Sequence, residues 1–280
     1  MKDESIIIQK ANGDHEKFDV NKLKASLLRS TATEHEADVI VAEILPQLHD
    51  GISTKKIYRK AFASLKKHNR ISASRYSLKR AILELGPTGF PFERLISALL
   101  SDNGFKTEIG ITLQGKCITH EVDVLAEKEG NTYPVECKFH SDPKSVSNVK
   151  VPLYINSRFI DIQKHWNTNS AKDTFLKQGW LVTNTRFSTD AIAYAKCVDL
   201  NLLSWNYPHE NGLKHNIDRF ALYPITVLTT LTKHEKKCII ENDTILTKEL
   251  YAAPHLFDKI GISKIRKKRI LNEIKRLCNL

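Results

Sequence analysis

A dense group of chain-breaking residues divides this sequence into parts with different patterns. Residues 86–91 read GPTGFP, so two prolines and two glycines fall within six positions. Proline lacks a backbone donor and glycine favours turns, so regular structure is expected to end here. Apolar residues recur at helical spacing before the break, whereas short strand-like runs dominate after it. A chain of 280 residues is long enough to hold two such differently built parts.

The segment before the break predicts a β-hairpin followed by helices. A strand–turn–strand pattern covers residues 5–18. Asp19 or Asn21 can then cap the first helix through its side-chain oxygen. Further helical patterns cover residues 22–30, 34–49, 54–68 and 72–85. We therefore predict a first domain over residues 1–86.

The segment after the break predicts an α/β domain over residues 87–220. An opening helix is followed by strands at 105–111, 117–126 and 132–139, a helix at 147–166, a strand at 179–183, a helix at 189–197 and a strand at 200–205. This order is typical of helices covering a mixed sheet. Residues 221–280 predict a mostly helical basic region. The expected class is α/β, or α+β over the whole chain.

Charge is concentrated at the two ends of the chain. Residues 1–86 carry 16 basic and 11 acidic side chains, residues 221–280 carry 12 and 6, and the stretch between them carries 15 of each. Basic ends suit anionic partners such as nucleotides or nucleic acid, although an ordinary solvated surface explains the same balance equally well.

Several classes of protein are made improbable by the composition. No apolar run approaches the roughly 18 residues of a membrane span. The N-terminal apolar stretch is only three isoleucines long, so we expect a cytoplasmic protein with no membrane partner. The five cysteines include no C-x-x-C pair, which argues against a disulfide framework or a structural zinc site.

Two predicted strands of the middle domain carry carboxylates that can meet. Asp123 lies on one strand, and Glu136 and Lys138 lie on the next. Side chains alternate along a strand, so Glu136 and Lys138 share a face from which Cys137 points away. Two carboxylates can hold Mg²⁺, and a lysine can orient the attacking water. By itself, however, this pattern is more often an edge strand with a surface Glu–Lys pair.

The surrounding residues resemble the P-D-(D/E)-x-K nuclease superfamily and, within it, the Mrr-like restriction endonucleases. The resemblance is carried by the motifs FERLI at 92–96, EVDV at 121–124, VECK at 135–138 and LVTNTRF at 181–187. It implies cleavage of DNA with Mg²⁺ or Mn²⁺. Asp123 and Glu136 would be metal ligands, the backbone carbonyl of Cys137 a third ligand, and Lys138 would act on the water.

Four further polar residues are candidates for accessory roles at this site. Glu93 can extend the metal site from the opening helix, but a surface or capping role is the favoured interpretation. Glu121 is either an auxiliary ligand or, as we prefer, a partner for a basic side chain. Arg158 and Gln163 lie on the helix after the motif and can reach phosphate.

The N-terminal segment resembles the ATP-cone domain of ribonucleotide reductases and their transcriptional repressor. The motifs IQKANG at 8–13, EKFD at 16–19, KL at 22–23 and LKR at 78–80 carry the resemblance. It implies binding of ATP or dATP as a regulatory ligand without hydrolysis. The residues implied to contact nucleotide are Lys10, Glu16, Asp19, Lys22, Thr54 and Arg80.

The C-terminal region contains a second, fainter resemblance, to a helix-hairpin-helix element that binds DNA phosphates. It centres on the stretch IGISK, residues 260–264. Candidate DNA contacts are Gly261, Lys264, Lys267, Lys268 and Arg269. The same stretch also fits an amphipathic helix that packs on a core through Ile265, Ile270, Ile274 and Leu277. We favour core packing, and the two interpretations are compatible.

The sequence thus predicts a nucleotide-regulated, Mg²⁺-dependent endodeoxyribonuclease that acts as a homo-oligomer on DNA. One alternative is a non-catalytic, nucleotide-controlled DNA-binding protein. Another keeps the enzyme but changes its substrate to RNA or branched DNA. The intact set of two carboxylates and a lysine argues against the non-catalytic alternative, because a binding module does not need all three.

Overall fold

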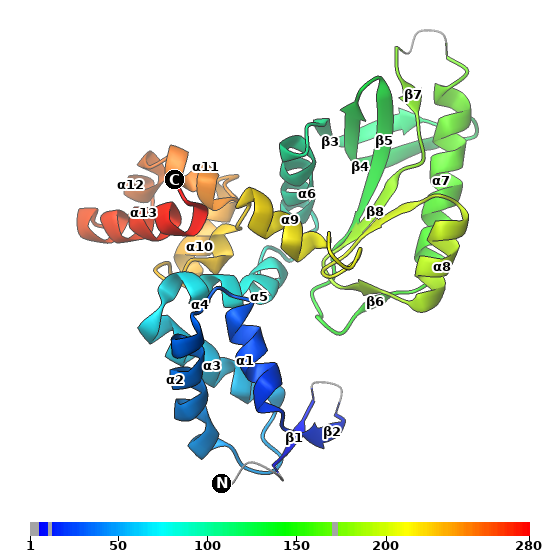
Figure 1. The fold of residues 1–280 in the computed structure, drawn as a ribbon. Helices are drawn as coiled ribbons and strands as arrows, with labels where there is room; N and C mark the ends of the chain where they lie inside the picture. The colour runs from blue at the N-terminus through cyan, green and yellow to red at the C-terminus, as the bar shows by residue number, and fades with distance from the viewer. Residues whose placement is uncertain (1–5, 11–12, 170–172) are drawn as a thin grey trace. The chain divides into compact units, whose positions relative to one another are not determined.

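The computed structural model describes residues 6–10, 13–169 and 173–280, and its ribbon is drawn in Figure 1. The chain forms two compact units. The first contains Met1–Ala81, Val227–Cys238 and Ala253–Leu280, and the second contains Ile82–Thr226 and Ile239–Ala252. The segment after residue 220 therefore contributes to both units. Within the described residues, no helix is long and apolar enough to cross a membrane.

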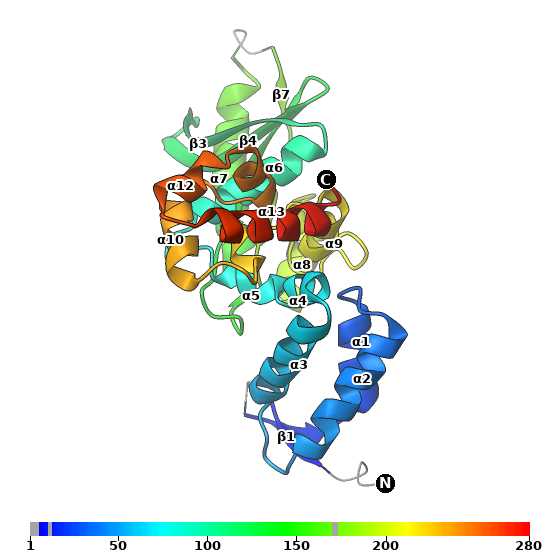
Figure 2. The same ribbon diagram turned by 90° about the vertical axis from the view of Figure 1, so that its left-hand side faces the viewer.

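The first unit begins with the predicted hairpin and continues as a group of helices. The hairpin pairs β1 and β2 in antiparallel fashion, and residues 11–12 of its predicted turn and residue 5 of its first strand lie outside the described residues. The elements are β1 (Ile7–Gln9), β2 (His15–Lys17), α1 (Val20–Leu28), α2 (Glu34–Ile44), η1 (Leu45–Gln47), α3 (Thr54–His68), α4 (Arg70–Tyr76) and α5 (Leu78–Leu83). The helices α1, α2 and α3 pack beside one another (Figure 2).

Capping residues fix where these helices begin. The Asp19 side chain accepts hydrogen bonds from the backbone N–H groups of Asn21 and Lys22, so Asp19, one of the two caps that the sequence allows, is the cap observed. Thr33 and Glu36 form a reciprocal capping box at the start of α2. Such caps satisfy the N–H groups that a helix start leaves without partners.

The core of the first unit is aliphatic. It is built from one stripe of each amphipathic helix, as the periodicity requires. Its fully buried members include Leu27, Ile40, Ile44 and Leu65.

The last part of the chain adds short helices to both units. They are α10 (Lys233–Glu241), α11 (Thr247–Ala252), α12 (His255–Lys259) and α13 (Lys264–Cys278). Helix α13 packs against α4 within the first unit. Ile270, Ile274 and Leu277 are fully buried, which confirms the predicted core-facing stripe. Ile265 is 71% exposed, so its expected place in that stripe is wrong: it lies in the first turn, beyond the packed part of the helix.

The second unit is built on one mixed sheet of six strands. Its main path runs β10-β8-β5-β4-β3, and β7 also pairs with β5. The strands β3, β4 and β5 are antiparallel, whereas β5, β8 and β10 are parallel. Their bounds are β3 (Lys106–Gln114), β4 (Thr119–Lys128), β5 (Asn131–Lys138), β7 (Phe175–Leu176), β8 (Trp180–Thr183) and β10 (Asn201–Leu203).

Helices cover both faces of this sheet, which gives three layers. In Figure 1, α6 (Phe90–Asp102) lies on one face and α7 (Lys150–Trp166) with α8 (Thr189–Cys197) lies on the other. Parallel strands must be connected by such crossovers and are buried between them. The predicted α/β class is thus confirmed. The remaining elements of the unit include β6 (Val146–Ser147), β9 (Arg186–Phe187) and α9 (Leu213–Phe220).

Candidate active site

The register of β4 and β5 brings the two predicted carboxylates together. Val124 is paired with Val135, and continuing this antiparallel register places Asp123 opposite Glu136. Directly opposed residues in an antiparallel pair have side chains on the same face. Asp123 is fixed further by its Oδ2 atom, which accepts a 2.6 Å hydrogen bond from the backbone N–H of Cys137.

Helix α7 supplies a cation to this pair. The Nη1 atom of Arg158 lies 2.7 Å from Oε2 of Glu136, and only 14% and 15% of the two side chains are exposed. The Nη2 atom of Arg158 donates to the backbone carbonyl of Glu121. Arg158 was expected to reach phosphate. In this structure it holds Glu136 in place and ties α7 to the start of β4.

Several acidic groups are close enough to perturb one another. Burial, together with the charges of Asp123, Glu121 and Glu136, raises the pKa of Glu93 to about 7. Burial also raises the pKa of Asp123. The pKa of Glu136 is raised by burial and by the charge of Asp123. Glu93 lies in the first turn of α6, where no described side chain caps the helix, and the charges of the other three carboxylates act on it.

The other two predicted residues lie at the end of β5. Lys138 is exposed, and its positive charge acts on both Asp123 and Glu136. The Cys137 side chain points to the opposite, buried face, and burial raises the pKa of its thiol well above the ordinary value. The thiol is therefore protonated and unsuited to a metal, so only the backbone of Cys137 can contribute a ligand.

The chemistry of these donors fits a hard divalent cation. Carboxylate and carbonyl oxygens are the ligands that Mg²⁺ prefers, and it keeps several waters in such sites. The mutual repulsion that raises the pKa values is relieved when a cation binds. The described residues contain no group of three or more His, Cys, Asp or Glu side chains already arranged around a metal position. The structure thus offers two carboxylates and a carbonyl, not a closed side-chain cage.

Gln163, a candidate for reaching phosphate, is engaged elsewhere, and His140 is a residue near the site that the sequence analysis did not single out. The side chain of Gln163 donates to the carbonyl of Leu176 at 3.0 Å, so it holds β7 and does not face the carboxylates. His140 follows β5 directly, and the side chain of Asn184 accepts from its N–H and donates to its C=O. Burial and the charge of Lys138 lower the pKa of His140. The sequence marks His140 as a site candidate only by its position two residues after Lys138.

A separate pocket of about 200 Å³ lies in the first unit. Four of the predicted nucleotide contacts line it, together with the rings of Tyr58 and Tyr76, which stack with centroids 5.1 Å apart. These four residues are Glu16, Asp19, Lys22 and Thr54. Lys10 lies at its edge, paired with Glu16 at 2.5 Å. Arg80 belongs to α5 and does not line the pocket.

The predicted DNA contacts of the C-terminal region lie around the start of α13. Gly261 has a left-handed backbone with φ of +74°, as a turn between two helices requires. Lys264, Lys268 and Arg269 are exposed. Lys267 is paired with Asp258 at 2.9 Å, which leaves its charge partly neutralised.

Comparison with known proteins places this geometry in a family. The fold is similar to the crystal structure of AF1548, a protein of unknown function, with a TM-score of 0.55 and 30% identity over 69% of this chain and 99% of that one. The chain is also 32% identical over 183 residues to an uncharacterized protein of Archaeoglobus fulgidus, covering 65% of this chain and 99% of the relative.

This chain belongs to the AF1548-like family. Residues 223–278 match the C-terminal domain of AF1548-like proteins. Residues 86–206 match the restriction endonuclease domain of the Mrr type, and this match contains Asp123, Glu136 and Lys138. The AF1548-like chain described here therefore carries a restriction endonuclease domain with its carboxylate pair assembled.

Proposed function

We propose that the middle domain is an endonuclease that hydrolyses DNA phosphodiester bonds with the help of Mg²⁺ or Mn²⁺. The observation that carries this proposal is the meeting of Asp123 and Glu136 beside Lys138, within a restriction endonuclease domain. Clustered carboxylates with raised pKa values and a nearby lysine are the groups that metal-assisted hydrolysis needs.

Each residue has a distinct role in this proposal. Asp123, Glu136 and the carbonyl of Cys137 would hold the metal, which when bound lowers the pKa of a water and stabilises charge at the phosphate. Lys138 would orient the attacking water or help to remove its proton. Glu93 and Glu121 sit close enough to tune the site electrostatically. Arg158 positions Glu136 through their ion pair.

The test is cleavage of supercoiled plasmid, linear duplex and single-stranded DNA in Mg²⁺, in Mn²⁺ and in EDTA. The wild-type protein should cut in metal and not in EDTA, and Asp123→Asn should not cut. Lys164→Ala is a matched control, because Lys164 is exposed on α7 and outside the site. Cleavage by Asp123→Asn at the wild-type rate would refute the assignment. Structured RNA and branched DNA are the alternative substrates to include.

We propose in addition that the pocket of the first unit binds ATP or dATP and regulates the nuclease. The favouring observation is a pocket that combines the Tyr58–Tyr76 stack with Lys22. Aromatic faces suit a base, and a lysine at a helix start suits phosphate. Lys22→Ala should weaken nucleotide binding in a calorimetric titration. Lys24→Ala is the control, because Lys24 on the same helix pairs instead with Glu34 and Asp38. Equal binding by both variants would contradict this proposal.

We also propose that the active form is a homo-oligomer, because cutting both strands of a duplex calls for two active sites. Light scattering with and without nucleotide tests it. A monomer that makes double-strand breaks in single encounters would contradict it. The non-catalytic alternative, a nucleotide-controlled DNA-binding protein, predicts DNA binding that needs no metal and no cleavage under any condition.

A further inference from the structure

A basic cleft lies within the first unit, between α4 and α13. We define it by six residues, Lys66, Arg70, Thr230, Arg266, Arg269 and Arg276. Two adjoining hollows of about 400 Å³ and 300 Å³ share Arg70, Thr230 and Arg269. All of these residues belong to the first unit, and the cleft is separate from the pocket that contains Lys22.

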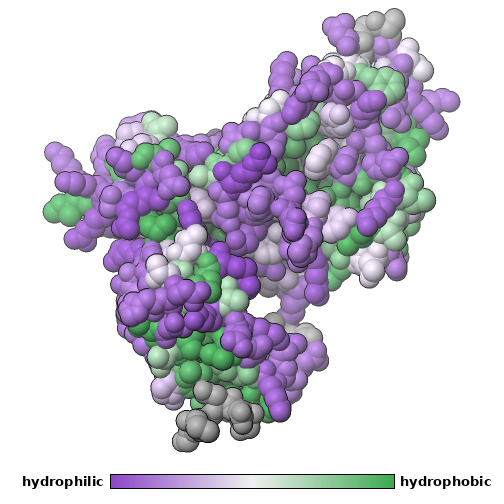
Figure 3. All heavy atoms as spheres, viewed as in Figure 1, coloured by the Kyte–Doolittle hydropathy of each residue, from purple (hydrophilic) through white to green (hydrophobic). Residues whose placement is uncertain are grey.

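The positive side of the cleft is a single stripe along α13. Arg266, Arg269, Glu273 and Arg276 are spaced by three, four and three residues, so they lie on one helix face. From Arg266 to Arg276 this face extends about 15 Å, given a rise of about 1.5 Å per residue. The surface over α13 is largely hydrophilic in the view of Figure 3.

The one acidic residue in the cleft is already satisfied by other groups. The Glu273 carboxylate is buried and accepts hydrogen bonds from five donors, the backbone N–H and hydroxyl groups of Thr229 and Thr230 and the hydroxyl of Ser74. A carboxylate offers about four lone-pair sites. Glu273 therefore has no capacity left for a bidentate pair with a neighbouring arginine.

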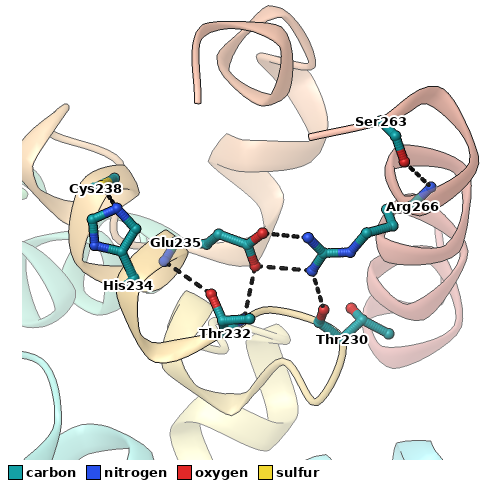
Figure 4. A network of polar contacts seen from close by, with 7 residues as sticks. All are labelled: Thr230, Thr232, His234, Glu235, Cys238, Ser263 and Arg266. Carbon is teal, nitrogen blue, oxygen red and sulfur yellow. Dashed lines mark hydrogen bonds and ion pairs between the residues drawn. The ribbon is translucent and has the colours of Figure 1, made fainter. Parts of the chain in front are cut away.

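Arg266 is neutralised by an ion pair, whereas the other three arginines of the cleft are not. Figure 4 shows Arg266 paired with Glu235, with Nη2 to Oε2 at 2.9 Å and a further bond to the carbonyl of Thr230. In contrast, Arg70, Arg269 and Arg276 make no ion pair with any described residue. Three exposed, unpaired guanidinium groups around one hollow repel one another unless an anion binds there.

We propose that this basic cleft binds the phosphate backbone of double-stranded DNA. Guanidinium groups match phosphate oxygens in bidentate geometry. A stripe of about 15 Å spans about four phosphates of one strand, measured along the duplex axis. No aromatic side chain lines the cleft among the described residues, so it offers no platform for unstacked bases. This combination favours a duplex backbone over a single strand or a nucleoside.

The inference deepens the proposed function, because it rests on DNA as the partner, but it does not depend on cleavage. The cleft shares only Arg269 with the predicted contacts around the start of α13, and it adds Lys66 and Arg70 from the N-terminal part of the chain. Two segments far apart in sequence thus build one surface.

The test is binding of a labelled 20-base-pair duplex to the full-length protein, by fluorescence anisotropy in EDTA over a series of salt concentrations. The variant Arg269→Gln/Arg276→Gln should weaken binding by about tenfold and reduce the slope of log K against log salt by about two. Arg269→Lys/Arg276→Lys should recover part of the affinity. Circular dichroism and thermal unfolding check that each variant is folded.

A matched control removes two charges from the same unit outside the cleft. Lys56→Gln/Lys275→Gln suits this purpose, because both lysines are exposed and Lys275 is turned about 100–120° from Arg276 and Arg269 around the axis of α13. An equal loss in this control would show general attraction and overturn the inference. An unchanged slope in the arginine variant, or equal loss for single strands, would also overturn it. The plasmid cleavage assay measures catalysis separately, so a loss of duplex binding can be distinguished from a loss of cleavage.

Discussion

The carboxylate site of the second unit gathers negative charges, whereas the basic cleft of the first unit gathers positive ones. Glu136 has its charge matched by Arg158, and Glu273 has its charge matched by five hydrogen-bond donors. Asp123 and Glu93 on one side, and Arg269 and Arg276 on the other, make no ion pair with any described residue. The comparison teaches that charges held by an ion pair or by several hydrogen bonds stabilise the fold, whereas charges without an ion pair are left to interact with an added ion. In the proposed function Glu136 belongs to both groups, because it pairs with Arg158 and would also bind the metal.

The largest expected effect comes from removing the lysine that is proposed to act on the attacking water at the carboxylate site. Lys138→Ala should reduce the cleavage rate about 100-fold or more, the range expected when a group that acts on the attacking water is lost. Duplex binding measured in EDTA should stay within about twofold of wild type. Single-turnover cleavage and anisotropy on the same preparation measure both. Cleavage at the wild-type rate would remove Lys138 from the mechanism.

Removing a compensating group in the same site should instead reduce stability. Arg158→Ala leaves Glu136 largely buried without its partner, and we expect the free energy of unfolding in EDTA to fall by about 2–3 kcal/mol. Mg²⁺ should restore part of this loss, because a cation replaces the guanidinium charge. Urea unfolding with and without Mg²⁺ measures it. A loss that Mg²⁺ leaves unchanged would mean that Glu136 is not a metal ligand.

The buried carboxylate of the first unit offers the matching experiment. Glu273→Ala leaves several donors of Thr229, Thr230 and Ser74 without an acceptor, and we expect a loss of about 2 kcal/mol. Mg²⁺ should not restore it, which distinguishes Glu273 from Glu136. Urea unfolding under the same conditions is the measurement. If Mg²⁺ restored the stability of Glu273→Ala, the response to Mg²⁺ would not distinguish Glu273 from Glu136.

The smallest effect concerns the ion pair drawn in Figure 4. Its hydrogen bonds from Arg266 lower the pKa of Glu235 to about 2, from an ordinary value of 4.5. A lowered folded pKa means that the pair stabilises the protein above about pH 4.5 and that this stabilisation is lost as the pH falls toward 2. Because Arg266 is 39% exposed, we expect about 1 kcal/mol or less.

The change Glu235→Gln tests this window. Unfolding midpoints of wild type and variant should differ at pH 6, differ less at pH 3 and converge only as the pH approaches 2. A difference that persists unchanged at pH 3 would show that the charge of Glu235 is not what stabilises the fold.

Much of this architecture could be predicted from sequence, because it follows from local periodicity. The helix expected at 54–68 is α3, and the one expected at 189–197 is α8, with the same limits. Residues 72–85 form two helices instead of one, since α4 ends at Tyr76 and α5 begins at Leu78. The short strands β6, β7 and β9 gave no signal, because two residues are too few for an alternating pattern.

The candidate site was predictable in part for the same reason. Asp123 and Glu136 are brought together by strand alternation and a hairpin, both readable from sequence. The ion pair of Arg158 with Glu136 could not be predicted from the sequence, because it depends on how α7 packs on the sheet. The basic cleft could not be predicted from the sequence either. Arg70 and Arg276 are separated by about 200 positions and meet only through the packing of α4 against α13.

The central claim is that the carboxylate pair of the second unit is a divalent-cation site. It is tested most directly by titrating Mn²⁺ into DNA-free protein and following the unbound ion by electron paramagnetic resonance. This readout does not depend on finding the preferred DNA substrate. The account predicts saturable Mn²⁺ binding to wild type, competed by Mg²⁺ and lost in Asp123→Asn and Glu136→Gln. Unchanged Mn²⁺ binding by both variants would contradict it.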